Sequence, residues 1–302
     1  MKNRYLLIAI VVLSIFAVVS SPSPKKTASF NTEENISVTI KDADNNEEKT
    51  LDLEEYIIGV VAGEMPASFE VEALKAQAIA ARSYALSKMN SSTTSYDLLT
   101  DVTNQVYITK EEMQEKWGLD YEYYYNRIKD AVLKTKDMVM EYDGNVISAY
   151  YFVMSNGATE DVSLVFGESK DYLQSVDSSW DENVKNFIVT TTFTKEEFCN
   201  KLSISCENIT IDKINRSKTN RVDKIVINNK EFKGTTFRSL LGLRSTDFTI
   251  SINDDVTITT KGYGHGVGMS QYGANEMAKT GADYTEILKH YYKDIDIVKM
   301  HV

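Results

Sequence analysis

The sequence predicts an α+β protein in which a main lobe carries a smaller inserted lobe. Helical periodicity is strongest between residues 53 and 90, and strand-like alternation around an Asp-Gly turn follows near residues 138–153. Residues 177–258 then change character, being rich in Thr, Asn and Lys with short Ile/Val alternations. We therefore expect a main lobe formed by residues 36–176 and 259–302, with residues 177–258 inserted as the smaller lobe.

The first residues have the pattern of an export or anchor segment. Lys2 and Arg4 precede an uninterrupted apolar stretch at residues 5–19. A stretch of this length is short for a membrane span, which needs about 20 residues, and fits a signal-peptide core. The residues that follow the apolar stretch lack a clean small-x-small cleavage site, so an uncleaved anchor is favoured. The rest of the chain is then expected on the extracytoplasmic side. Residues 1–20 are predicted to be a membrane anchor or signal segment, and residues 21–35 a flexible tether.

Composition limits the possible partners and metals. The formal net charge is -11 and no run of clustered Lys and Arg occurs, which argues against a nucleic-acid partner. The chain has two cysteines, Cys199 and Cys206. They form either a disulfide or a free pair, or a metal pair, but two thiols without a nearby His make a poor zinc site. We expect no metal at these residues.

The helices of the first half are the clearest local predictions. A strand is expected at residues 36–40, followed by a helix at residues 53–63 that Pro66 ends. A second helix is expected to begin after Ser68 as its N-cap. Its buried stripe, at helical spacing, is formed by Leu74, Ala78, Ala81 and Ala85.

The later elements follow from shorter patterns. A helix is predicted at residues 121–136, and a hairpin joins residues 138–142 to residues 146–153 through the Asp-Gly turn. Polar residues near 194–202 predict a helix in the smaller lobe. Residues 284–292 predict a terminal helix.

Glu64 is the strongest candidate for chemistry on local grounds. It lies at the corner between two helices, directly before Met65 and Pro66. Apolar neighbours raise the pKa of a carboxyl group by desolvation, as a general acid working near neutrality requires. The alternative is that Glu64 merely ends its helix.

Lys75 and Arg82 form a second candidate pair. They are seven residues apart on the second helix, so they lie on one face about 10 Å apart along the axis. Two cations so placed suit the carboxylates or hydroxyls of adjoining sugar repeats, although a solvated helix face explains the spacing as well. Both residues lie off the predicted buried stripe, so we expect them to be exposed.

These segments together resemble a known family. EYIIGVVAGEMPASF at residues 55–69 and EALKAQAIAARSYA at residues 72–85 are similar to the signature of the stage II sporulation protein D family. Further matches are SNGATE at residues 155–160, YLQSV at residues 172–176 and GYGHGVGMSQYGA at residues 262–274. The matches occur in family order over nearly all of the exported part.

The resemblance implies a peptidoglycan lytic transglycosylase that acts on glycan strands already stripped of stem peptides. It implies that Glu64 is the catalytic residue. It also places Lys75, Arg82, Thr159 and Tyr172 on positions that line a glycan groove across the main lobe. In such a reaction one carboxyl group acts as acid and then as base, and the product is a 1,6-anhydro-muramyl end.

Two further residues of the matched segments are candidates for substrate binding. Ser155 opens the Ser-Asn-Gly match. His265 lies among five glycines, where the backbone can approach a ligand closely. His265 either contacts the glycan or bonds a backbone carbonyl beside the Glu64 corner in a structural role.

The resemblance also implies partners and a location. Members of the family act in engulfment during spore formation, at the sporulation septum or engulfing membrane. They act together with an amidase, stage II sporulation protein P, and a membrane scaffold protein. A non-catalytic wall-binding module that stimulates an amidase is the main alternative, and a scaffold that only bridges proteins is a third.

One departure from the family pattern concerns metals. Members often carry His, and sometimes Cys, just before the Ser-x-Gly motif, where some hold zinc. Here that stretch is Tyr151-Phe152-Val153-Met154, which has no such ligand. We therefore predict no metal and no cofactor, and interpret residues 152–154 as a buried strand.

Overall fold

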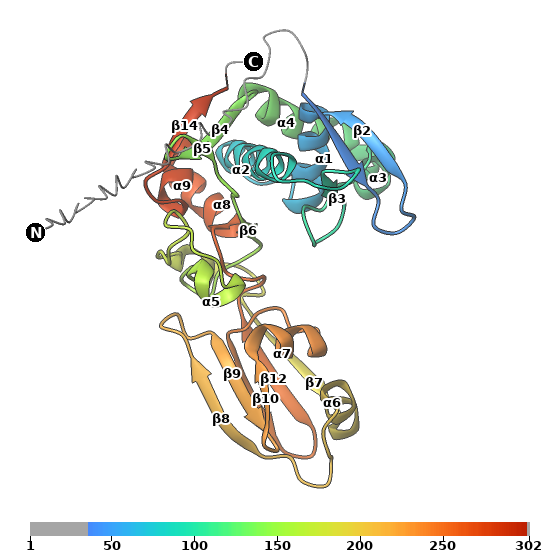
Figure 1. The fold of residues 1–302 in the computed structure, drawn as a ribbon, viewed down its shortest axis with the longest axis vertical. Helices are drawn as coiled ribbons and strands as arrows, with labels where there is room; N and C mark the ends of the chain where they lie inside the picture. Colours follow the sequence, from blue (N-terminus) through green and yellow to red (C-terminus); the bar gives the residue numbers. More distant parts are fainter. Residues whose placement is uncertain (1–35, 301–302) are drawn as a thin grey trace, which may run out of the picture.

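The computed structural model describes residues 36–300, which fold into a mixed α+β structure with two separate hydrophobic cores. The larger core lies in the helical part of the molecule and the smaller core in a mainly β part at its other end (Figure 1). The predicted anchor and tether, including the membrane contact at residues 5–19, lie outside the described residues. Among residues 36–300, no helix combines the length and apolarity that a membrane crossing requires.

The main lobe is built from helices flanked by three small sheets. Its sheets have the strand orders β2-β1-β3, β14-β4-β5 and β13-β6. The helices are α1 (Leu53–Glu64), α2 (Val71–Met89), α3 (Lys110–Trp117), α4 (Tyr121–Lys134), α5 (Val162–Phe166), α8 (Gln271–Lys279) and α9 (Tyr284–Tyr291). The strands are β1 (Ser37–Lys41), β2 (Glu48–Asp52), β3 (Leu98–Leu99), β4 (Met138–Tyr142), β5 (Asn145–Val146), β6 (Tyr151–Phe152), β13 (Met269–Ser270) and β14 (Asp296–Lys299).

Helix α2 is the central element of this lobe. It is surrounded by α1, α4, α8, α9 and strand β4 (Figure 1). Six of its residues, Ala73, Ala76, Ala78, Ala80, Ala81 and Ala85, are buried alanines, and such small side chains let neighbouring helices approach on several faces. The predicted single buried stripe was therefore too narrow, because α2 is enclosed by packing on most of its circumference.

The helix ends differ slightly from the sequence expectation. The first helix ends at Glu64, and Met65 takes an extended conformation before Pro66, as the residue before a proline usually does. The second begins at Val71 with Glu70 as N-cap, not after Ser68. The reason is a turn in which the backbone N–H of Phe69 donates to the carbonyl of Pro66.

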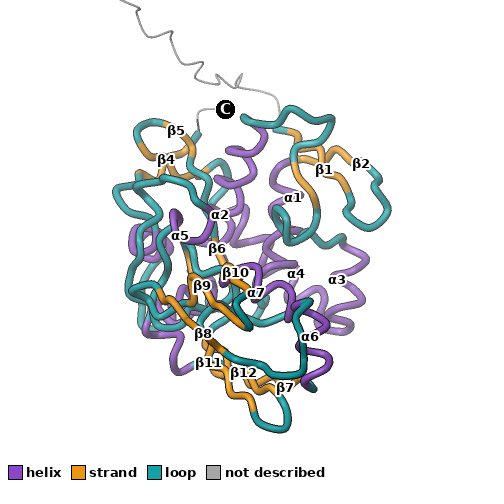
Figure 2. The backbone as a smooth tube through the Cα atoms, turned by 60° about the horizontal axis from the view of Figure 1, so that its bottom comes forward, coloured by secondary structure: helices purple, strands orange, loops and turns teal. Residues whose placement is uncertain are grey.

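The small lobe consists of two three-stranded antiparallel sheets with two helices. Strands β7 to β12 lie together, with α6 beside β7, in both views of the molecule (Figures 1 and 2). The elements are β7 (Ile188–Phe193), α6 (Lys195–Leu202), β8 (Ile211–Arg216), β9 (Val222–Ile227), β10 (Lys230–Lys233), α7 (Gly234–Leu241), β11 (Phe248–Ile252) and β12 (Val256–Lys261). Helix α7 lies at the end of this lobe that faces the main lobe (Figure 1).

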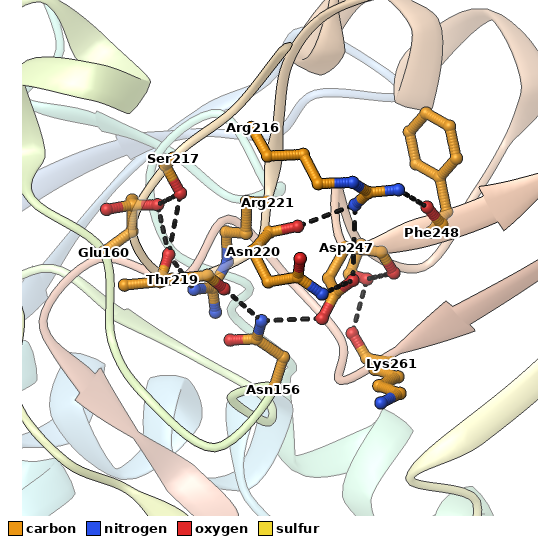
Figure 3. Close-up of polar contacts among 11 residues, drawn as sticks. Asn156, Glu160, Arg216, Ser217, Thr219, Asn220, Arg221, Asp247, Phe248 and Lys261 are labelled. Carbon is orange, nitrogen blue, oxygen red and sulfur yellow. Dashed lines mark hydrogen bonds and ion pairs between the residues drawn. The ribbon is translucent and has the colours of Figure 1, made fainter. Parts of the chain in front are cut away.

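A polar cluster, in which Glu160, Arg221 and Asp247 are buried, joins the two lobes (Figure 3). Glu160, which precedes α5, accepts hydrogen bonds from the hydroxyls of Ser217 and Thr219 in the small lobe. Arg221 donates through Nη2 to the carbonyl of Ala158 at 3.0 Å. We call Asn156, Glu160, Ser217, Thr219, Arg221 and Asp247 the lobe junction. Its bonds cross between the lobes, so it holds the small lobe in place against the main lobe.

Candidate functional site

Glu64 is the last residue of α1, and its side chain lies at a surface hollow beside the loop that contains Val106. The backbone N–H of Val106 donates to Glu64 Oε1 at 2.7 Å. The loop approaches α1 closely because residues 59 and 63 are glycines. A Cβ atom at Gly63 would lie 2.5 Å from the carbonyl oxygen of Val106, which no side chain tolerates. The small residues of α1 therefore allow the contact that orients the Glu64 carboxyl group.

Burial raises the pKa of Glu64 from its ordinary value to about 7, although hydrogen bonds from Val106 and the Gln271 side chain lower it in part. Among residues 36–300, no Lys, Arg or His forms an ion pair with Glu64. Near neutral pH the group therefore holds a proton part of the time. This is the protonation behaviour that a general acid needs.

Two hollows meet at Glu64, and both are also lined by Val153. The first, of about 470 Å³, lies between the α1 corner, α8 and the start of α4, with Lys116, Trp117 and Tyr124 in its wall. The second, of about 570 Å³, is lined by residues of both lobes, including His265 and Arg238. We call the two hollows the groove. Within the described residues, Glu64 is the only carboxylate that lines either of them.

A hydrogen-bonded chain of polar side chains lies behind Glu64. Tyr56 donates its hydroxyl proton to Gln105 Oε1 at 3.0 Å, and Gln105 Nε2 donates to the Tyr151 hydroxyl at 2.8 Å. The negative charge of Glu64 contributes to raising the pKa of Tyr151, after the larger effect of burial. Tyr151 therefore stays protonated, and the residue lines the second hollow together with Glu64.

The prediction of a buried strand at residues 152–154 is correct only in part. Phe152 and Met154 are 4% and 2% exposed, and β6 pairs in parallel with β13. Val153, between them, lines both hollows. Phe152 also lines the second hollow, so the stretch is largely buried and at the same time forms part of the groove wall.

His265 lies in the wall of the second hollow, in the role that the sequence offered as its structural alternative. Its Nε2 lies 3.0 Å from the carbonyl oxygen of Tyr151, and its Nδ1 accepts a hydrogen bond from the N–H of Val267 at 3.1 Å. These partners assign the proton to Nε2. Burial, followed by the charge of Arg238, lowers the pKa of His265 to about 4, so the ring is neutral at physiological pH.

The expectation that Arg82 is exposed on a helix face is wrong. Arg82 is 0% exposed and donates through Nε and Nη2 to the two carboxylate oxygens of Glu54 at 2.8 and 2.6 Å. A further bond runs from Nη1 to the carbonyl of Met138 at 3.0 Å. The residue is buried because α2 is packed on the face that carries it, and here it joins α1, α2 and β4.

Lys75 lies nearer the surface but also away from the groove. Its Nζ is 2.6 Å from Glu72 Oε1 and 5.6 Å from the centre of the Tyr284 ring. Glu72 Oε2 accepts the N–H of Tyr284 at 3.2 Å. Lys75 thus belongs to the contact between α2 and the start of α9, and it lines neither hollow.

Three other candidate residues form contacts within the main lobe, away from the groove. Thr159 is 0% exposed, and its Oγ1 accepts the N–H of Val176 at 2.8 Å. Ser155 is also 0% exposed and donates to the carbonyl of Ser178 at 3.1 Å. Tyr172 packs against Tyr142, and its hydroxyl accepts the N–H of Ser148 at 3.2 Å. None of the three lines the groove, so the structure does not bring them together with Glu64.

The two cysteines form a disulfide between Cys199 and Cys206 in the small lobe. In the part of the chain that the structure describes, no group of three His, Cys, Asp or Glu side chains is placed to hold a metal ion. The expectation of no metal and no cofactor stays a prediction.

Several groove residues were missed by sequence reasoning. Gln271 lies inside the glycine-rich match but has no charge to single it out, and Tyr151 belongs to the stretch that is distinguished only by having no metal ligand. Arg238 and Lys88 carry charge, yet they lie in segments without a recognisable motif. Their place in the groove depends on how the lobes pack.

Comparison with known proteins identifies the family. Residues 41–142 match the family described as stage II sporulation protein (SpoIID). Stage II sporulation protein D of Bacillus amyloliquefaciens is 42% identical over 273 residues, which cover 88% of this chain and 79% of that protein. The Bacillus subtilis (strain 168) protein of the same name is 42% identical over 270 residues, covering 87% of this chain and 79% of that protein. The amidase enhancer of Bacillus subtilis (strain 168) is 29% identical, covering 78% of this chain and 39% of that protein. The sequence matches and the relatives agree, and the chain belongs to the stage II sporulation protein D family.

Proposed function

We propose that this protein is a lytic transglycosylase acting on peptidoglycan during sporulation. The bond that it cleaves joins N-acetylmuramic acid to N-acetylglucosamine in peptide-free glycan strands. The observation that carries the proposal is the single carboxyl group of Glu64, with its pKa raised to about 7, where two hollows meet. The relatives named for sporulation support the cellular setting.

One carboxyl group is sufficient for this chemistry. Protonated Glu64 donates its proton to the glycosidic oxygen while the bond from the muramyl C1 to that oxygen breaks. The C6 hydroxyl of the same muramyl residue then forms a bond to C1, and the Glu64 carboxylate takes the proton that the hydroxyl loses. Most hydrolytic glycosidases need a second carboxylate to activate water or to attack, and none lines the groove within residues 36–300. Because the attacking hydroxyl is tethered, its effective concentration is high.

The two hollows suit an extended polysaccharide that crosses the Glu64 corner. Trp117, Tyr124 and Tyr272 line the first, while Tyr150, Phe166 and Tyr263 line the second. Aromatic rings offer flat apolar faces with polar edges, which match the faces of pyranose rings. The strand would thus be held on both sides of the bond that reacts.

The proposal extends to setting and partners. The protein acts on the extracytoplasmic side of the membrane, at the sporulation septum or engulfing membrane. It works together with the amidase stage II sporulation protein P and a membrane scaffold protein, because peptide-free strands require an amidase to act first.

The decisive experiment uses defined peptide-free strands and the variant Glu64→Gln. The amide preserves shape and still accepts the Val106 hydrogen bond, but it has no proton to transfer. We expect 1,6-anhydro-muramyl products from the wild-type protein and a rate about 100- to 10,000-fold lower for the variant, with strand binding retained. A variant within a few fold of the wild-type rate would exclude this mechanism.

A second function is favoured by one relative, the amidase enhancer. A non-catalytic wall-binding module that stimulates an amidase needs the groove but not a proton donor. In that case Glu64→Gln would stimulate a purified amidase as well as the wild-type protein does. The wild-type protein alone would release no anhydro-muramyl product.

A further inference from the structure

The second hollow of the groove, which Glu64 lines, also contains two cations. Lys88, at the end of α2, and Arg238, in α7, both line it. No ion pair formed within residues 36–300 includes either side chain. In a chain of net charge -11, two cations without an acidic partner in one hollow indicate that the hollow receives an anion.

Arg238 is the better placed of the two cations. Its Nε donates to the carbonyl of Leu243 at 3.2 Å, which fixes the guanidinium at the end of α7. In the described part of the chain its two terminal nitrogens donate no hydrogen bond. Those nitrogens form the planar fork that matches the two oxygens of a carboxylate. Burial lowers the pKa of Arg238, as expected for a partly desolvated cation that lacks an acidic partner.

Neighbouring residues give this position the character of a sugar site. Tyr263 lines the same hollow and is 41% exposed, with the Arg244 guanidinium 4.6 Å from its ring centre. His265, in the same wall, stays neutral in part because Arg238 is charged. A ring face beside a guanidinium suits a sugar that carries a carboxylate.

The lobe junction fixes this arrangement. Its bonds join Glu160 and Asn156 of the main lobe to Ser217, Thr219 and Asp247 of the small lobe (Figure 3). Helix α7 lies at the end of the small lobe that faces the main lobe (Figure 1). The small lobe therefore contributes Arg238 to a groove whose carboxyl group belongs to the main lobe.

We propose that Arg238, assisted by Lys88, binds the free lactyl carboxylate of a muramyl residue and thereby selects strands whose stem peptides have been removed. This inference rests on the proposed function. Muramyl residues carry a lactyl group that ends either in an amide bond to the stem peptide or, after that bond is hydrolysed, in a carboxylate. Only the second form supplies two anionic oxygens to the guanidinium. The reaction that supplies the substrate is hydrolysis of the lactyl amide bond.

The test measures binding in the Glu64→Gln background, where strands are not consumed. Two ligands are compared by calorimetry: peptide-free strands, and the same strands with their lactyl carboxylates converted to primary amides. We expect the free strands to bind about 10- to 100-fold more tightly, the difference that one charge-assisted contact makes. Arg238→Gln should remove this preference by weakening only the binding of the free strands.

Two further variants sharpen the test. Arg238→Lys keeps the charge without the fork and should retain part of the preference. Lys201→Gln removes an exposed cation of the small lobe that does not line the groove, and it should change nothing. Melting temperatures are measured on every sample.

The outcomes separate the inference from the proposed function. Equal affinity for free and amidated strands without any change at residue 238 would overturn the carboxylate site, whether or not Arg238→Gln folds. An equal loss of affinity for both ligands in Arg238→Gln would also overturn it, because that result indicates a structural role for Arg238. Failure of the proposed function would appear elsewhere, as absence of anhydro-muramyl products from the wild-type protein.

Discussion

The two ends of helix α1 carry carboxyl groups in opposite electrostatic settings. Glu54, in its first turn, receives two hydrogen bonds from the guanidinium of Arg82, at 2.8 and 2.6 Å, and is 8% exposed. Glu64, its last residue, receives a backbone hydrogen bond and forms no ion pair within residues 36–300. The first carboxyl group serves the fold, and the second is left able to exchange a proton.

The difference explains why a shared helix supports both roles. A buried carboxylate that is paired and hydrogen-bonded can stay charged, because the partner replaces the water it lost. A partly buried carboxyl group without a cation instead gains affinity for a proton. The same helix thus holds one carboxyl group in an ion pair and leaves the other able to take up and release a proton.

The largest change in stability is expected when the ion pair between Arg82 and Glu54 is broken. Arg82→Ala leaves Glu54 buried without its partner and should lower the free energy of unfolding by about 3 to 5 kcal/mol. Denaturant unfolding of the purified domain measures this. Replacing both partners, as in Arg82→Met with Glu54→Leu, should recover much of the loss. If Arg82→Ala melted like the wild-type protein, the pair would not matter to the fold and the contrast between the two ends would fail.

At Glu64, the carboxyl group without an ion pair, the stability of the folded protein should fall as the pH rises. The pKa of Glu64 is raised from 4.5 to about 7 in the folded protein. Its contribution to stability is fully present below pH 4.5 and is lost as the pH rises to about 7. Glu64→Gln removes this loss, so the variant should exceed the wild-type protein by up to about 3 kcal/mol above pH 7 and match it below pH 4.5. Melting curves from pH 4 to 8 test this, and a constant difference between the two proteins would contradict it.

In the proposed reaction the same carboxyl group sets the pH dependence of activity. The carboxyl group must be protonated at the start of the reaction. We therefore expect kcat/KM to fall about tenfold per pH unit above about pH 7. Gln271→Leu removes a hydrogen bond that lowers this pKa. The falling limb should then move upward by less than about one unit, the size of one such bond. A downward shift would mean that Gln271 favours the protonated form instead.

The smallest effect is expected at Lys75. Its ion pair with Glu72 lies near the surface, with the Lys75 side chain 19% exposed, so Lys75→Ala should cost no more than about 1 kcal/mol. Binding of peptide-free strands to the Glu64→Gln protein should not change with it, because Lys75 lines neither hollow. Weaker strand binding at an unchanged melting temperature would instead place Lys75 in a glycan site, as the resemblance implied.

Local sequence signals determined the elements that depend on residues near one another. The corner at Glu64, Met65 and Pro66 follows from the restriction that proline places on the preceding residue. The Asp143-Gly144 turn formed as expected, with positive φ angles of 49° and 69°. Thr194 caps α6 through a capping box with Glu197. Each of these depends on contacts within a few residues, which the sequence states directly.

The tertiary structure alone decided which charged and polar side chains reach the groove. On spacing, Arg82 has the position of an exposed cation, yet α2 is packed on most of its faces and the guanidinium meets Glu54 in the core. Thr159 and Tyr172 lie in matched motifs, yet their hydroxyls bond backbone groups away from Glu64. Arg238 has no motif, and it reaches the second hollow because the lobe junction sets α7 against the main lobe. Periodicity along one helix reports what that helix can bury, whereas burial itself depends on every element that packs around it.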